Sequence, residues 1–426
     1  MMEKVFNKKT DSFWLRAVLT LVFVCAYVLS EPTLNSVYFL YCTYRIQTLV
    51  VFANYAILIC IYALFLITCI QKRKKFQSWP DFGILGPYLL IYLCFLAATL
   101  HSPETGSMAR WWDCFLYSLI PLMTASVFFT SEEGMRYYIR TVSWIYLAAA
   151  VLNIVFFCFP QLYVGEAKEW REAFFLGVKN KCGWPLTMGM VFTLLNWKIN
   201  GNRWQVAIYI LLLLINIKIV MCITALMGTA ILICWMVLPF VRKWFEKWDF
   251  LVFVGIIVVL FLCLMFFQKY TVSSEPVALF IEEVLQKKRN MSGRLPLWQM
   301  GVAIVLMHPF LGVGITTKQG FIHMANEYGE WLDFHAHNEL LQTWYEGGLL
   351  TVAAALGMLI YGAREFRRCS DCSLAGVCKV CIFMFLFMLL SEDMAYYMWY
   401  MVGFLLHVSI MLCHSRGALP REDGDR

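Results

Sequence analysis

The feature that most constrains this chain is a series of apolar segments, each nearly long enough to cross a lipid bilayer. A helical span needs about 20 mostly apolar residues, and about twelve segments approach that length in this sequence. They cover residues 13–30, 47–70, 82–101, 111–130, 141–160, 183–199, 205–220, 222–240, 250–267, 338–362, 377–391 and 394–413. Lipid offers no partner for an unpaired backbone amide, so such segments are expected to be helices. The sequence therefore predicts an all-α polytopic membrane protein of about 12 transmembrane helices.

The composition supports the same class. The chain is 61% hydrophobic and 15% charged, with a mean hydropathy of +0.66. Soluble globular chains are about half apolar and about a quarter charged, so a soluble protein is excluded. The net charge of +7 comes largely from short basic loops. Arg364, Arg367 and Arg368 are accordingly interpreted as determinants of membrane topology and not as a nucleic-acid patch.

Lysine and arginine set the expected orientation, because cytoplasmic loops carry an excess of them. With the N-terminus inside, short basic loops such as 72–75 and 242–247 all fall on the cytoplasmic side. An even number of spans then places both termini in the cytoplasm. We expect a multi-pass protein of the cytoplasmic (inner) membrane. On the outer side, Glu392 and Asp393 are predicted to lie in a solvated turn between the last two spans.

Two longer outer loops, 161–182 and 268–337, interrupt the short connections, and long loops are usually functional. The second loop divides the chain into three predicted parts: nine spans in 1–267, a large helical extracytoplasmic loop at 268–337, and three spans with a short cytoplasmic tail in 338–426. Within the loop, residues 277–285 carry apolar side chains at helical spacing. This pattern indicates a helix on the outer membrane surface or one packed on the bundle. The apolar run 295–307 is too short to span, which favours a re-entrant or interfacial segment.

The densest polar cluster of the chain lies where this loop ends. His335, His337, Asn338 and Glu339 come directly before a long apolar segment, and Glu346 follows beside two glycines. Polar groups at the edge of a bilayer are costly to place, so a functional role is the first hypothesis to test. A histidine there is suited to general base catalysis, because its unperturbed pKa leaves it largely neutral at working pH.

The loop and the segment after it contain an ordered set of motifs. In chain order these are Ser292-Gly293-Arg294, Trp298, His308-Pro309-Phe310-Leu311-Gly312-Val313-Gly314, His337-Asn338-Glu339-Leu340-Leu341-Gln342 and Glu346-Gly347-Gly348. Their order and spacing resemble the signature of the O-antigen ligase and polymerase superfamily. Residues 177–183 also resemble the Lys-Asn-x-x-Gly stretch that this family carries before its sixth span. The likeness covers most of the chain after the fifth predicted span.

The resemblance implies a membrane glycosyltransferase with a GT-C-like fold, acting in polysaccharide biosynthesis for the cell envelope. Such proteins move a glycan from undecaprenyl diphosphate to an acceptor hydroxyl on the outer face of the membrane. They use no nucleotide sugar, cofactor or metal. The implied partners are therefore the undecaprenyl-diphosphate-linked oligosaccharide, the glycan acceptor and membrane lipid, with no nucleic acid. The implied function is that of an O-antigen or capsular-type polysaccharide polymerase or ligase.

The same resemblance implies roles for residues of the polar cluster. His337 is the expected general base, which takes the proton from the acceptor hydroxyl, and His335 is the alternative. Asn338 and Glu339 are candidates to orient the base or to bind acceptor sugars. The alternative for Asn338 is a helix cap.

Donor binding is expected to depend on cations that clamp the diphosphate. Arg294 stands where the family carries a loop arginine. Arg289 is close enough in sequence to assist, although the basic end of an amphipathic helix is the favoured explanation for it. The family also carries a second arginine near the start of the eighth span, where this chain has Met227. We expect Lys218 or Lys179 to supply the missing charge.

The cysteines raise the question of a metal site. Cys369, Cys372, Cys378 and Cys381 form two CxxC pairs, a pattern that can bind zinc. The gap between the pairs is short, and the last cysteine falls in the eleventh predicted span, so we expect no metal. The loop is predicted to be cytoplasmic, where a stable disulfide is not expected.

A transporter and a non-enzymatic scaffold or sensor are the alternatives to the glycosyltransferase. A lipid-linked oligosaccharide flippase or another transporter would favour charged residues inside spans and repeat symmetry, whereas these spans are nearly free of charge. A scaffold or sensor would not need a base and phosphate clamps in one loop. The sequence does not separate polymerase from ligase, and the missing second arginine favours a polymerase.

Overall fold

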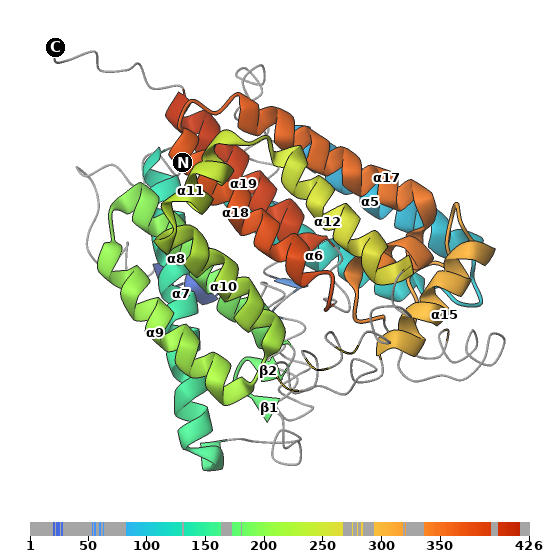
Figure 1. The fold of residues 1–426 in the computed structure, drawn as a ribbon, viewed down its shortest axis with the longest axis horizontal. Helices are drawn as coiled ribbons and strands as arrows, with labels where there is room; N and C mark the ends of the chain where they lie inside the picture. The colour runs from blue at the N-terminus through green and yellow to red at the C-terminus, as the bar shows by residue number, and fades with distance from the viewer. Residues whose placement is uncertain are drawn as a thin grey trace.

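The computed structural model of the chain is almost entirely helical (Figure 1). It describes residues 82–129, 132–162, 173–179, 181–266, 294–317, 336–392 and 399–417, together with isolated positions in 20–63 and 275–283 and at 320. The described positions in the first two predicted spans are helical. The predicted loop helix at 277–285 lies almost wholly outside the described residues.

From the third predicted span onward, every apolar segment corresponds to helix. The helices are α5 (Phe82–His101), α6 (Met108–Phe128), α7 (Glu132–Cys158), α8 (Gly183–Asn200), α9 (Arg203–Val220), α10 (Ile223–Val237), α11 (Pro239–Lys247), α12 (Phe250–Phe266), α15 (Arg294–Met307), α17 (Glu339–Arg367), α18 (Cys372–Met388) and α19 (Tyr400–Gly417). The connection between α7 and α8 contains the 3-10 helix η2 (Pro160–Leu162) and an antiparallel pair, β1 (Ala173–Phe174) and β2 (Gly177–Val178).

Within the described part of the chain, three helices are long and apolar enough to cross a membrane: α7, α9 and α17. A fourth is added if α10 and α11 form one bent span. The apolar parts of α5, α12, α15, α18 and α19 are shorter. The predicted helical membrane class is therefore confirmed in its coarse form. The number of twelve spans, the division into three parts and the interfacial place of 295–307, now α15, stay predictions.

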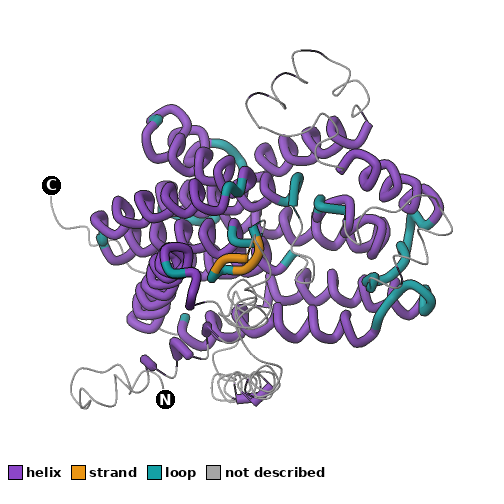
Figure 2. Tube along the Cα trace, turned by 90° about the horizontal axis from the view of Figure 1, so that it is seen from below, coloured by secondary structure: helices purple, strands orange, loops and turns teal. Residues whose placement is uncertain are grey.

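The helices pack into one bundle (Figures 1 and 2), and most residues of α18 and α19 are buried within it. Helix α18 contacts α10, α11, α12 and α19, and α17 lies along α5. Nearly every residue of α8 and α18 is buried, whereas α9 and α12 expose large apolar side chains such as Leu211 and Val259. Apolar surfaces of this kind are expected to face lipid in a membrane protein.

The predicted span over 222–240 corresponds to α10, and the chain bends close to its end. Helix α10 ends at Val237, and the chain turns by 96° into α11. Pro239 is the first residue of α11, where its missing N–H removes no helical hydrogen bond, but the same residue would interrupt a continuous helix. Helix α11 is amphipathic, with basic residues and aromatic residues on a short segment.

Several polar side chains inside the bundle bond to neighbouring helices. Asn153 of α7 donates to Asn216 of α9 at 2.8 Å, and it accepts from the backbone N–H of Leu176 at 3.0 Å. Asn196 of α8 donates to Gln205 of α9 at 2.5 Å. Hydrogen bonds between helices of this kind satisfy groups that lipid cannot. The bond from Leu176 N–H to Asn153 also attaches the β1–β2 turn to the bundle.

Candidate active site

Helix α17 is broken near its start, and a neighbouring loop occupies the break. Gly348 has φ 68° and ψ −175°, so the helical hydrogen bonds are interrupted there. The carbonyls freed by the break accept from the loop after α15. Val313 N–H donates to the Tyr345 carbonyl at 2.9 Å, and Gly314 N–H donates to the Glu346 carbonyl at 2.8 Å. The chain turns at Gly312-Val313-Gly314, where both glycines have positive φ, and this turn binds the broken start of α17.

The break requires glycine at its centre. The backbone conformation of Gly348 is one that residues with a side chain rarely adopt, and a Cβ there would overlap the Phe310 carbonyl. The loop is also fixed from its other side by the α5–α6 region. Thr105 Oγ1 donates to the Val313 carbonyl at 2.6 Å, and Ile315 N–H donates to Thr99 Oγ1 at 3.1 Å. The loop, α5 and α17 therefore form one connected unit beside the polar cluster.

Asn338 is the N-cap of α17. Its Oδ1 accepts from Leu341 N–H at 2.9 Å, and its Nδ2 donates to the Leu390 carbonyl at 2.8 Å. Glu339 N–H donates to the Leu389 carbonyl at 3.0 Å, and both side chains are buried. These bonds join the start of α17 to the end of α18. The geometry therefore supports the cap alternative for Asn338, since both of its polar atoms have protein partners.

His337 is held in a strained backbone conformation. Its φ is 48°, a region that residues other than glycine occupy infrequently. The preceding residue is fixed on both sides. Trp298 Nε1 donates to the Ala336 carbonyl at 2.9 Å, and Ala336 N–H donates to Gln342 Oε1 at 3.3 Å. Such strain persists where surrounding contacts determine the backbone, as they do here.

A buried carboxylate links His337 to Arg294. His337 Nδ1 lies 3.4 Å from Glu392 Oε2, and Arg294 Nη2 lies 2.5 Å from Glu392 Oε1. Arg294 also donates to the Ser391 carbonyl, and Thr224 Oγ1 donates to Glu392 Oε1 at 3.3 Å. Three residues far apart in the chain, His337, Arg294 and Glu392, thus meet at one point. We call this set the Glu392 cluster.

The electrostatics of the cluster keep the carboxylate ionised. Burial of Glu392 opposes ionisation, but the neighbouring His337 imidazole and the charge of Arg294 outweigh that effect. The pKa of the Glu392 carboxyl therefore lies below its usual value. A carboxylate beside Nδ1 orients an imidazole ring. The cluster thus brings together an imidazole, a carboxylate and a guanidinium.

The prediction that Glu392 lies in a solvated turn is wrong. The residue is 4% exposed, because the turn after α18 lies beneath the start of α17. The backbone bond from Glu339 to Leu389 and the side-chain bond from Asn338 to Leu390 draw the two segments together. Nothing in the sequence near Ser391 distinguishes this turn from an ordinary polar one. Asp393 lies outside the described residues.

Glu346 supports the cluster without joining it. It is 1% exposed, and its Oε1 accepts from Thr316 Oγ1 at 2.5 Å, from Thr316 N–H at 3.1 Å and from Gln342 Nε2 at 3.4 Å. Gln342 in turn accepts from Ala336, the residue before His337. The carboxylate therefore connects the loop after α15 to the segment that carries the histidine. This contact set favours a structural role for Glu346.

The remaining candidates for substrate binding are not brought together by the described contacts. Lys218 is exposed at the end of α9, Lys179 is half-buried after β2, and Met227 is exposed on α10. His335 and Arg289 lie outside the described residues. Roles for these residues in donor or acceptor binding stay predictions.

The four cysteines of the CxxC pairs have free thiols. Cys378 and Cys381 are buried, Cys369 is half-buried and Cys372 is exposed. Among the residues that the structure describes, no group of three or more His, Cys, Asp or Glu side chains is placed to hold a metal ion. The described geometry therefore offers no zinc site at this end of the bundle.

Comparison with protein families gives a match largely in the second half of the chain. Residues 206–356 match the family described as O-antigen ligase. The matched region runs from α9 into α17, so it includes Arg294 and His337 of the Glu392 cluster but ends before Glu392. No curated protein matches the chain.

Proposed function

By its 206–356 region this chain is a member of the O-antigen ligase superfamily, and from that premise we propose that it transfers a glycan from undecaprenyl diphosphate to an acceptor hydroxyl. The reaction would take place on the outer face of the cytoplasmic membrane and build O-antigen or capsular-type polysaccharide. One observation carries the proposal. The buried carboxylate of Glu392 holds a histidine and an arginine in one cluster, and group transfer from a diphosphate needs both.

In the proposed reaction, His337 is the general base. Its Nε2 takes the proton of the acceptor hydroxyl as the oxygen attacks the anomeric carbon of the donor. The bond between that carbon and the diphosphate oxygen breaks, and the diphosphate leaves with the electron pair. The imidazolium that forms is stabilised by Glu392, which already contacts Nδ1. This scheme is balanced without a metal ion.

Arg294 is proposed to bind the leaving diphosphate. A guanidinium carries five N–H donors, and the structure commits one each to the Ser391 carbonyl and to Glu392. Donors therefore remain for phosphate oxygens. The fixed geometry of the arginine favours this role, since its planar fork matches phosphate.

A second cation is proposed to come from Lys218 or Lys179, because Met227 cannot bind phosphate. We further propose His335 as the alternative base and Arg289 as an accessory clamp. Each residue is changed singly to alanine and glycan transfer is measured. Full activity of the Lys218→Ala, Lys179→Ala and double variants would show that the donor is bound by other groups.

The experiment that tests the function measures surface polysaccharide in cells lacking the gene. The cells are rescued with wild type, His337→Ala or the control His308→Ala, and glycan size is read on a gel. His308 ends α15, outside the Glu392 cluster. We expect wild type and His308→Ala to restore glycan, whereas His337→Ala loses about 10²- to 10⁴-fold of the transfer rate. A His337→Ala protein that is made normally and rescues fully would contradict the proposal.

The same gel separates the two acceptor classes. Loss of long chains, with single repeat units still attached at the surface, identifies a polymerase. Loss of all attached glycan, with polymer still on its lipid carrier, identifies a ligase. We propose a polymerase, because the arginine at the Met227 position is missing.

A further inference from the structure

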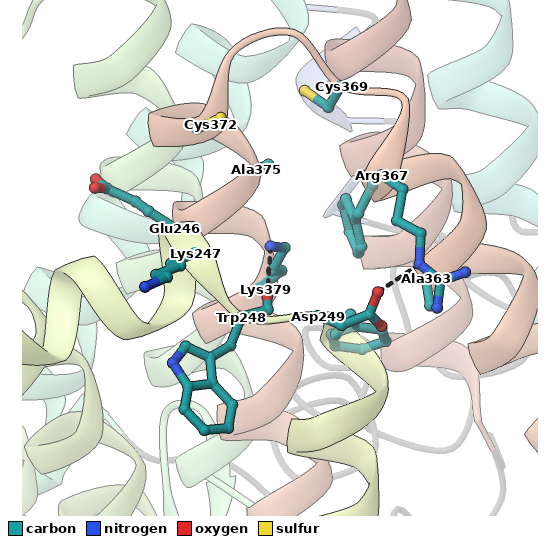
Figure 3. A pocket seen from close by; sticks show the side chains of 12 residues that line it. Glu246, Lys247, Trp248, Asp249, Ala363, Arg367, Cys369, Cys372, Ala375 and Lys379 are labelled. Carbon is teal, nitrogen blue, oxygen red and sulfur yellow. Dashed lines mark hydrogen bonds and ion pairs between the residues drawn. The ribbon is translucent and has the colours of Figure 1, made fainter.

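A second polar site lies at the other ends of α17 and α18, away from the Glu392 cluster. There the structure contains a pocket of about 240 Å³ (Figure 3). The pocket is lined by the end of α11, the start of α12, the end of α17 and the start of α18. Its charged lining residues are Glu246, Lys247, Asp249, Arg367 and Lys379. The glycosyltransfer proposed above uses none of them.

Lys379 is the most unusual of these residues. It is 6% exposed, and its Nζ donates to the Trp248 carbonyl at 3.0 Å (Figure 3). Among the described residues it forms no ion pair. An ammonium has three donors, so two remain for a ligand. A buried charge without a counter-ion is costly, which makes an anion in the pocket favourable.

The aspartate of the pocket does not provide that counter-ion. Asp249 is already paired with Arg367, and its Oδ1 accepts from Leu251 N–H at 2.9 Å. Its charge is therefore balanced within the pocket wall. The charged lining residues that remain are then Lys379, Lys247 and a single carboxylate, that of Glu246. The pocket keeps a positive balance.

The surroundings of the pocket indicate where its ligand comes from. Helix α11 forms one side, and its aromatic residues Phe240 and Trp244, with Trp248 after it, are half or more exposed at 54%, 55% and 50%. Basic residues alternate with them at Arg242, Lys243 and Lys247. Exposed aromatic and basic side chains on a short amphipathic helix are typical of the boundary between lipid and water.

We propose that this pocket binds the phosphate headgroup of an anionic membrane lipid. The Lys379 ammonium would contact the phosphate, and Lys247 would attract it at the pocket mouth. Trp248 and Phe250, which also line the pocket, would lie against the glycerol and the first acyl carbons. Basic pockets between membrane helices are known to take such headgroups. This proposal does not depend on the glycosyltransferase function.

The test uses the full-length protein in nanodiscs of phosphatidylcholine with and without phosphatidylglycerol. The affinity for phosphatidylglycerol is measured by lipid titration, and retained lipid is identified by native mass spectrometry. The variants are Lys379→Gln, Lys379→Arg and Lys247→Gln. The control is Lys198→Gln. Lys198 donates to Ser373 at 2.8 Å near the same end of α18 but does not line the pocket.

We expect Lys379→Gln and Lys247→Gln each to weaken phosphatidylglycerol binding by about fivefold. Lys379→Arg and Lys198→Gln should bind like the wild type. Lys247 is exposed, so its variant tests the site even if Lys379→Gln does not fold. Unchanged binding in Lys379→Gln, or an equal loss in Lys198→Gln, would overturn the proposal. Thermal unfolding is also compared with phosphatidylglycerol and with inorganic phosphate. If inorganic phosphate alone stabilises the protein as much as phosphatidylglycerol does, the pocket binds free phosphate and the lipid proposal is overturned.

Discussion

The two ends of α17 and α18 each hold an arginine paired with a carboxylate, and the two pairs differ in burial. In the Glu392 cluster, the side chain of Arg294 is 17% exposed and that of Glu392 is 5% exposed. At the other end, the side chain of Arg367 is 59% exposed and that of Asp249 is 29% exposed. The chemical groups are the same, but water solvates only the second pair well.

The difference shows what each pair contributes. Removing two charges from water costs several kcal/mol per ion, so a buried pair is weak evidence for stability and strong evidence for another role. Glu392 has additional contacts with His337 and Thr224 that a simple ion pair does not need. An exposed pair contributes little and fits a wall of an open pocket. Catalysis is therefore expected at the first pair and not at the second.

The largest expected effect comes from removing one charge of each pair. Glu392→Gln leaves the Arg294 guanidinium buried without its partner, so we expect a loss of about 3–5 kcal/mol in unfolding free energy. Asp249→Asn at the exposed pair should leave the unfolding midpoint nearly unchanged. Chemical denaturation of both purified variants in detergent measures the difference. Equal destabilisation of the two would remove the distinction drawn between the pairs.

A second test concerns the backbone that supports the buried pair. Gly348→Ala should destabilise the protein by about 1–3 kcal/mol or more, because alanine is strained there and its methyl group overlaps the Phe310 carbonyl. The control is Gly357→Ala, farther along α17, where a Cβ meets no atom within 4 Å. This control should be neutral or stabilising by about 0.5–1 kcal/mol. Thermal unfolding in detergent compares them, and similar midpoints would show that the break tolerates a side chain.

A third test keeps the charge of each arginine and removes its planar fork. Arg294→Lys should lower the rate of glycan transfer about tenfold, equivalent to about 1.4 kcal/mol, because lysine cannot contact Glu392 and a phosphate in the same way. Arg367→Lys should leave the rate unchanged. Transfer is followed with a lipid-linked donor in membranes containing equal amounts of each protein. A rate for Arg294→Lys equal to that of wild type would assign the clamp to another cation.

The smallest expected effect is a pH dependence. The pKa of Glu392 is lowered in the folded protein, so its contribution to stability is present above the unfolded pKa and is lost as pH falls through the folded pKa. Acidification below the usual glutamate range should therefore destabilise the wild type more steeply than Glu392→Gln. Asp249 also has a lowered pKa, through its hydrogen bond with Arg367, but solvent screens this exposed group. Unfolding midpoints across acidic pH give both slopes, and parallel slopes for wild type and Glu392→Gln would refute the coupling.

Much of the fold was predictable, since apolar length and period determine helices directly. The segment 82–101 coincides with α5, and the family resemblance points to Arg294 and His337, which the structure brings to the same carboxylate. Glu392 was not predictable, because its burial results from packing between α17 and α18 and not from its neighbours in sequence. The bend at Pro239 had a local signal, a proline within an apolar run, whose effect the hydropathy pattern outweighed.

The broken start of α17 also limits how the protein can be recombined. Tyr345 and Glu346 offer their carbonyls to the 313–314 backbone, and Gly348 leaves room for Phe310. Each segment therefore fixes the backbone conformation of the other, although about thirty residues of chain separate them. A chimaera with a relative would have to exchange residues 309–316 and 345–350 together. Grafting either segment alone would join two halves of an interface that were not matched to each other.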